Sequence, residues 1–185
     1  MSPKLHLVPG LILPIIVFSV FVRTGLTQGP LPIVQVTGKV RVNGGEVRSG
    51  TPIFSGVTIH TAATNSSAVI SLGKLGRLEI LEDTELKIEF SDARMVLLLL
   101  KPGRIRLSTP AGVGATVRSA EIQAIVDKAA PNDFSLETSC DKVTVETRSG
   151  RVLLGVGGPT LVVKEILAGS SETVDTPKAI GCKVK

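Results

Sequence analysis

The side chains of this 185-residue sequence that could do chemistry are few and widely spaced. Histidine occurs only at His6 and His60, so a Ser/His/Asp site would have to use His60, and no nucleophile motif lies near it. Strand alternation points His60 outward, which favours a solvated histidine over a catalytic base. We therefore expect no enzyme activity, no catalytic residue and no metal or cofactor site.

Carboxylates are densest in one eleven-residue stretch, which contains Glu79, Glu82, Asp83, Glu85 and Glu89. Paired carboxylates can act on sugars or bind calcium. However, Glu82 and Asp83 are turn residues, and the other three occupy outward strand positions beside Lys87. The pattern favours a solvated charged face.

Two glycine-rich segments, Gly112–Gly114 and Gly155–Gly158, resemble phosphate-binding loops only in composition. Neither leads into a helix, whose terminus such a loop needs, so we predict turns. Carbohydrate sites usually need aromatic platforms, and the chain has no Tyr or Trp. Outside the N-terminal block, the only aromatic residues are Phe54, Phe90 and Phe134, and we expect all three in apolar strand positions.

Two cysteines, Cys140 and Cys182, are too few for a disulfide scaffold or a zinc site. In an exported protein, a Cys140–Cys182 disulfide would attach the tail to the body of the domain. The alternative is two unrelated small apolar residues, and sequence spacing does not decide between them.

The net charge of +5 is spread along the chain. From Pro30 onward, 19 basic residues are interspersed with 16 acidic ones, without a run of five like charges. A nucleic-acid partner would require a clustered basic face and usually stacking aromatics, so we expect none.

The N-terminal segment Leu7–Val22 carries no charge and is followed by Arg23. A transmembrane helix needs about 20 apolar residues and a signal-peptide core about 7–15, so this segment falls between them. Pro9, Gly10 and Pro14 are tolerated in membrane helices. We predict an N-terminal hydrophobic helix that acts as an export signal, either cleaved or retained as a membrane anchor.

The rest of the chain alternates apolar and polar residues between turn-forming segments, which is typical of short β-strands. Strand material begins at Val34–Val42, and Asn43–Gly45 is a hairpin turn. The further expected strands are Val57–Thr61, Ser67–Leu72, Arg77–Leu81, Glu85–Phe90, Met95–Lys101, Arg104–Ser108, Val117–Val126, Asp133–Thr138, Val143–Arg148, Arg151–Leu154, Thr160–Lys164 and Glu172–Val174. Segment 109–116 is expected to be a loop.

Two strand segments carry more specific predictions. Met95–Leu100 reads MVLLLL and has lost its alternation, which indicates a strand covered on both faces. Val143–Arg148 and Arg151–Leu154 flank Ser149-Gly150, and we predict that they form a hairpin.

One short element recurs along the chain: Gly, a basic residue, then an apolar-x-apolar strand. It occurs at Gly38–Val42, Gly76–Ile80, Gly103–Leu107 and Gly150–Leu154. Glycine permits a turn with positive φ before the strand. The unequal separations exclude a strict repeat, but the recurrence predicts successive similar turns in a stacked or rolled β-sandwich or a β-solenoid-like domain.

Several motifs in this part of the chain are similar to those of the FecR domain family. They are TPAGVGATVRSAEIQAIV (109–126), FSLETSCDKVTVETRSGRVLL (134–154), the segment 50–72 and the closing segment 167–174. The resemblance covers roughly Val34 to Val174. It departs from the family pattern at Gly56-Val57, at Arg118-Ser119-Ala120 and at Ile122.

The resemblance implies an extracytoplasmic all-β domain, often beside one membrane helix. In signalling members of the family, a cytoplasmic segment binds a sigma factor. Because only six residues precede the apolar block here, we expect sigma-factor regulation to require a separate cytoplasmic partner.

We therefore predict a signal or anchor with linker in residues 1–29, a FecR-like β domain in 30–174 and a tail in 175–185. The expected role is a non-catalytic binding or scaffolding module of the cell envelope, in the periplasm or at the cell surface. Its expected partner is an envelope protein or surface polymer. The alternative is an accessory to transmembrane signalling through sigma-factor regulation.

Overall fold

The computed structural model describes residues 31–92, 95–119, 121–139, 141–157 and 162–175. The membrane segment Leu7–Val22 and both cysteines, Cys140 and Cys182, lie outside these residues, so the predicted N-terminal helix and the disulfide stay predictions. Helix within the described residues is limited to the 3-10 turn η1 (Gly73–Leu75), and none there is long and apolar enough to cross a membrane.

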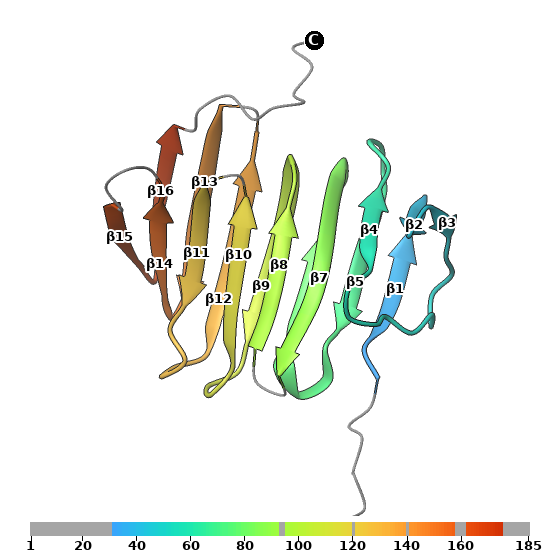
Figure 1. The fold of residues 1–185 in the computed structure, drawn as a ribbon, viewed down its shortest axis with the longest axis horizontal. Coiled ribbons are helices and arrows are strands. Elements are labelled where there is room, and N and C mark those ends of the chain that lie inside the picture. The colour runs from blue at the N-terminus through green and yellow to red at the C-terminus, as the bar shows by residue number, and fades with distance from the viewer. Residues whose placement is uncertain (1–30, 93–94, 120, 140, 158–161, 176–185) are drawn as a thin grey trace, which may run out of the picture.

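The all-β prediction is confirmed, since the described residues form two sheets that pack face to face (Figure 1). Sheet A contains, in spatial order, β1 (Ile33–Thr37), β5 (Ser67–Ser71), β6 (Arg77–Ile80), β9 (Gly103–Thr109), β12 (Asn132–Thr138), β13 (Lys142–Ser149) and β16 (Ser170–Asp175). Sheet B contains β3 (Gly45–Glu46), β2 (Val40–Val42), β4 (Thr58–Thr61), β7 (Thr84–Asp92), β8 (Met95–Leu100), β10 (Gly114–Ser119), β11 (Ile122–Val126), β14 (Arg151–Val156) and β15 (Val162–Leu167).

The strands follow one another in space almost as they do in sequence, while the chain passes repeatedly between the two sheets. Neighbouring strands are antiparallel, except for β8 and β10, which are parallel because the chain visits sheet A as β9 between them. The fold therefore grows along one axis, from β1 and β3 at one end to β15 and β16 at the other (Figure 1). Of the predicted fold class, the structure confirms an all-β domain made of two sheets.

Side chains on the inner face of each sheet form one apolar core. Alternation along the strands selects them, as in β12, where Phe134 and Leu136 are buried and Ser135 between them is not. Strand β8 follows the same rule, with Val96 and Leu98 fully buried and Leu97 partly exposed on the outer face. The prediction that β8 is covered on both faces is therefore wrong within the described residues.

The predicted hairpin around Gly150 is also wrong, because β13 belongs to sheet A and β14 to sheet B. Gly150 has φ +80°, and a Cβ atom there would lie 2.1 Å from Oδ1 of Asn132. That buried amide accepts a hydrogen bond from the backbone N–H of Arg151 (2.9 Å) and donates to the carbonyl oxygens of Asp127 and Ala130. Only glycine can carry the chain from one sheet to the other against this side chain.

Two other crossings repeat this arrangement of glycine, buried polar side chain and basic residue: Gly38 with Ser66 and Lys39, and Gly103 with Thr84 and Arg104. The backbone N–H of the basic residue donates to the hydroxyl oxygen over 3.0 and 2.9 Å. Three of the four recurrent elements therefore mark the points at which the chain changes sheet. The fourth, at Gly76, joins β5 and β6 within sheet A.

Other strand boundaries differ from the prediction. The segment Val34–Val42 divides at Gly38 into β1 and β2, and Val117–Val126 divides into β10 and β11. The expected loop 109–116 contributes its last three residues to β10. The turn at Asn43-Gly44 is confirmed, with φ of 50° and 82°. Phe54 lies outside the strands and is 58% exposed, so the prediction that it occupies an apolar strand position is wrong.

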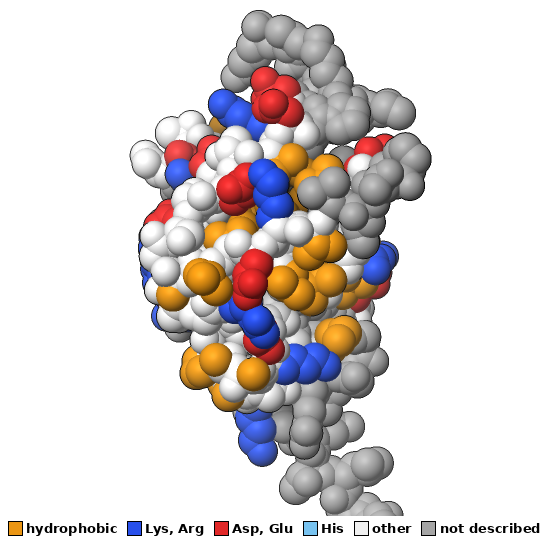
Figure 2. Space-filling view, turned by 90° about the vertical axis from the view of Figure 1, so that its left-hand side faces the viewer, with side chains coloured by type: hydrophobic (Ala, Val, Ile, Leu, Met, Phe, Trp, Pro, Cys, Tyr) orange, Lys and Arg blue, Asp and Glu red, His pale blue; other side chains and the backbone are white. Residues whose placement is uncertain are grey.

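The two ends of the sandwich are closed differently. At the first end, the free edge of β1 is occupied by the segment 48–53, through hydrogen bonds such as Val34 N–H to Thr51 O (3.0 Å) and Ile53 N–H to Pro32 O (2.8 Å). At the other end, an ion pair between Lys164 of β15 and Glu172 of β16 joins the sheets. Figure 2 looks onto this end, where hydrophobic side chains lie among charged pairs. Charged side chains at an edge discourage further strand pairing.

Candidate functional site

The carboxylates that are dense in the sequence are separated in the structure. Glu79 lies on the outer face of sheet A and is paired with Arg77 (2.9 Å). Glu85 and Glu89 lie on sheet B, and a carboxylate oxygen of each forms an ion pair with a lysine Nζ at 2.6 Å. The solvated-face interpretation therefore holds for these three residues, and they form no acid–base pair.

His60 lies exposed in β4, opposite Glu85 of β7. The outward orientation expected from strand alternation is thus confirmed. Within the described part of the chain, no cluster of three or more His, Cys, Asp or Glu side chains could hold a metal ion.

The outer side chains of sheet A form what we call the charged face. Its tightest contact joins Arg106 of β9 to Asp133 of β12 through two hydrogen bonds, of 2.8 and 2.5 Å. These bonds lower the pKa of the Asp133 carboxyl below its ordinary 3.8, and the positive charges of Arg106 and Arg148 act in the same direction. Asp133 therefore remains ionised at neutral pH, and Arg106 is held by it.

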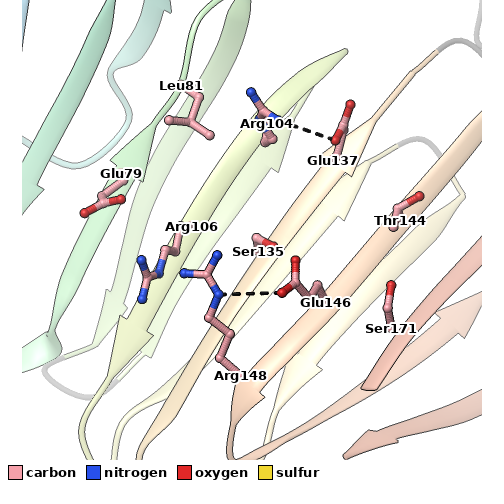
Figure 3. A pocket seen from close by; sticks show the side chains of 10 residues that line it. All are labelled: Glu79, Leu81, Arg104, Arg106, Ser135, Glu137, Thr144, Glu146, Arg148 and Ser171. Atoms are coloured by element: carbon pink, nitrogen blue, oxygen red, sulfur yellow. Dashed lines mark ion pairs between the residues drawn. The ribbon is translucent and has the colours of Figure 1, made fainter. Parts of the chain in front are cut away.

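A shallow groove crosses the charged face (Figure 3). It runs over β6, β9, β12, β13 and β16, and the small side chains Ser135, Thr144 and Ser171 lie between charged ones. The two ion pairs that join lining residues to each other are loose: Arg104 to Glu137 at 3.9 Å and Arg148 to Glu146 at 3.6 Å. Because arginines and carboxylates alternate here, the groove has no dominant charge for a simple anion or cation.

The outer side chains of sheet B differ, because many of them are apolar. Register places Leu97 of β8, Thr116 of β10, Ile125 of β11 and Leu153 of β14 in one row across the sheet. Ile125 is 40% exposed, and Leu97 and Leu153 are partly exposed. We call Leu97, Leu99, Ile125, Leu153 and Val163 the apolar face. Exposed apolar patches on soluble domains typically mark interaction surfaces.

Cations lie at one side of the apolar face and also within it, because the row that contains Leu99 and Val163 runs through Arg118 and Gln123. Lys87 of β7 and Arg118 of β10 lie in register on either side of Leu99, in a hollow that also includes Lys101. Lys87 and Lys101 are paired with Glu89 and Glu85. Arg118 makes no ion pair with any side chain that the structure describes.

The opposite side of the apolar face carries a second set of charges. Arg151 of β14 donates to Glu165 of β15 (3.0 Å) and is paired with Asp127. A backbone hydrogen bond from Ala129, with help from Arg151, lowers the pKa of the Asp127 carboxyl below its ordinary 3.8. Ion pairs thus border the apolar face on both sides, and each side carries positive and negative side chains.

Sequence reasoning missed the apolar face, although part of its signal was visible. The MVLLLL run predicts a doubly covered strand, whereas its outward leucines are partly exposed, beside Ile125 and Leu153 from strands distant in sequence. Only the register of β8, β10, β11 and β14 brings them into one patch.

Comparison with known proteins supports the fold. No family model matches the chain, and no curated protein matches it either. Among solved structures, it is similar to the crystal structure of a candidate anti-sigma factor from Parabacteroides distasonis, with 15% identity and a TM-score of 0.53. The alignment covers 64% of this chain and 54% of that chain, so this chain spans about half of that protein. At this identity, the likeness is one of fold.

Proposed function

We propose that this protein is a non-catalytic, FecR-like binding module of the cell envelope, tethered by residues 7–22, which docks a protein partner on its apolar face. The observation that carries the proposal is the contrast between the two sheets. Sheet A presents paired charges, whereas β8, β11, β14 and β15 of sheet B present leucine, isoleucine and valine side chains, with ion pairs on either side. An apolar centre with a charged rim is the usual composition of a protein interface.

The apolar face is a better docking site than the strand edges. The edge of β1 is occupied, and the ion pair of Lys164 with Glu172 places charges at the other end. A partner strand added there would bury this ion pair, which is unfavourable unless its charges find further partners.

A second candidate is an accessory to transmembrane signalling that works with a separate cytoplasmic partner. The similarity in fold to a candidate anti-sigma factor favours it. This role also requires export and a docking surface, so both candidates share the apolar face but differ in the partner.

The test is a crosslinked pull-down of the full chain, with a C-terminal tag, from intact cells of its own host. We compare the unmodified chain with Ile125→Glu on the apolar face and with Ser71→Glu, an exposed position on the outer face of sheet A. Envelope proteins recovered with the unmodified chain and Ser71→Glu, but lost with Ile125→Glu, are the expected result. Equal recovery with both variants would contradict docking on the apolar face.

The identity of the captured protein separates the two candidates. A membrane-bound sigma regulator or a receptor would favour the signalling role. Recovery of cytosolic proteins alone, with the tagged chain soluble in the cytosol, would overturn the export prediction on which both candidates depend.

A further inference from the structure

We infer that the partner of the apolar face is a second copy of this chain, packed with its own apolar face against the first. This inference rests on the proposed function, since it names the occupant of the same surface. Two-fold association uses one patch twice, so it requires a surface that is compatible with itself in shape and charge.

The shape of the apolar face suits such packing. Leu97, Ile125 and Leu153 lie in one cross-strand row, and Leu99 and Val163 lie in the neighbouring row. Sheets pack face to face at about 10 Å, with side chains from such rows interdigitated.

The charges around the patch also favour an identical partner. Lys87 is paired with Glu89, and Arg151 with Glu165, so each side of the apolar face presents both signs. An anionic membrane surface would repel these carboxylates, whereas a second copy can offer each charge its opposite. Arg118 lies within the patch, between Leu99 and Gln123, so a carboxylate of the second copy has to pair with it on association.

The small area available predicts a weak dimer. The whole outer face of β8, β10, β11, β14 and β15, with its charged residues included, measures about 480 Å² per copy, from about 4.8 Å between strands and about 20 Å of strand length. Two copies would bury about 1,000 Å², near the lower limit for a specific interface. Tethering by residues 7–22 would raise the local concentration of copies in the membrane and compensate for the small area.

The test uses two copies of the full chain with different tags, expressed together in the host. Benzoylphenylalanine replaces Ile125 in one copy, and a matched control places it at Ser71 on sheet A. Illumination should give an adduct of twice the monomer mass that contains both tags. We expect at least tenfold more of it from position 125 than from position 71, and at least a tenfold loss when the other copy carries Leu153→Glu.

Three outcomes separate this inference from the proposed function. A two-tag adduct at position 125 that is lost with Leu153→Glu supports the second copy. An adduct at position 125 with one tag and a different mass overturns the second copy but leaves docking on the apolar face standing. Equal adducts, or none, at positions 125 and 71 overturn both. Unchanged far-UV circular dichroism of the Leu153→Glu chain, purified in detergent, shows that a loss reflects the surface and not unfolding.

Discussion

The outer faces of the two sheets are built from the same strand geometry but carry different side chains. On sheet A, register places Arg106 between Glu79 and Ser135, and Asp133 fixes its guanidinium. On sheet B, the equivalent outward positions hold Leu97, Leu99 and Ile125. Paired charges are stable in water without a partner, whereas exposed leucines gain free energy when they are covered. This difference is the reason that the proposed docking surface lies on sheet B and not on sheet A.

The largest expected effect separates the inner and outer faces of β8. Leu98→Ala removes a fully buried side chain and should lower the free energy of unfolding by about 3 kcal/mol. Leu99→Ala, one residue further along, removes a partly exposed side chain and should lower it by less than about 1 kcal/mol. Thermal unfolding of both variants checks this. Equal losses would mean that the apolar face is covered within the chain and is not available for docking.

The next effect concerns Gly150, where the chain crosses from sheet A to sheet B. Gly150→Ala should destabilise the protein by about 2–3 kcal/mol, because of its positive φ and the contact with Asn132. Gly169→Ala is the matched control, with φ +78° but no atom within 4 Å of the added Cβ. Gly169→Ala should lower the free energy of unfolding by about 1 kcal/mol, from backbone strain alone. Equal melting temperatures for the two variants would contradict the packing role of Asn132.

A smaller effect is expected on the charged face. Asp133→Asn should cost about 0.5–1 kcal/mol at neutral pH, because the ion pair with Arg106 is partly exposed. The lowered pKa of Asp133 means that its contribution is present above about pH 4 and is lost as pH falls through the folded-state pKa. The unmodified chain and the variant should therefore converge in melting temperature toward pH 2. A constant difference between pH 7 and pH 2 would show that the charge is not responsible.

The smallest effect is expected at the border of the apolar face. Arg151→Gln breaks contacts with Asp127 and Glu165 that are solvent-exposed and screened by salt. We expect no resolvable change in melting temperature at physiological ionic strength. If the apolar faces associate, the same variant should still weaken two-tag crosslinking from Ile125. A variant that lowers the melting temperature but leaves crosslinking intact would assign Arg151 a role in folding alone.

Local sequence patterns predicted the strands of the candidate site better than its surfaces. Alternation correctly placed His60 and Glu79 outward, because each side chain along a strand points to the opposite face from its neighbour. It could not join Leu97 to Ile125 and Leu153, which lie on strands whose pairing is set by hydrogen bonds over long sequence distances. The same limit hid the separation of Glu79 from Glu85, which the crossing between β6 and β7 puts on opposite sheets.

The sequence by itself determined that this chain is all-β, where most strands lie, and that similar glycine turns recur, because these features depend on neighbouring residues. Only the tertiary structure decided what each turn does. A glycine with positive φ can close a hairpin, as in Asn43-Gly44, or carry the chain to the other sheet, as at Gly150. The choice at Gly150 depends on Asn132, a buried amide 18 positions earlier that fills the space beside it and bonds to the next residue. Such a contact exists only after the two sheets have packed together.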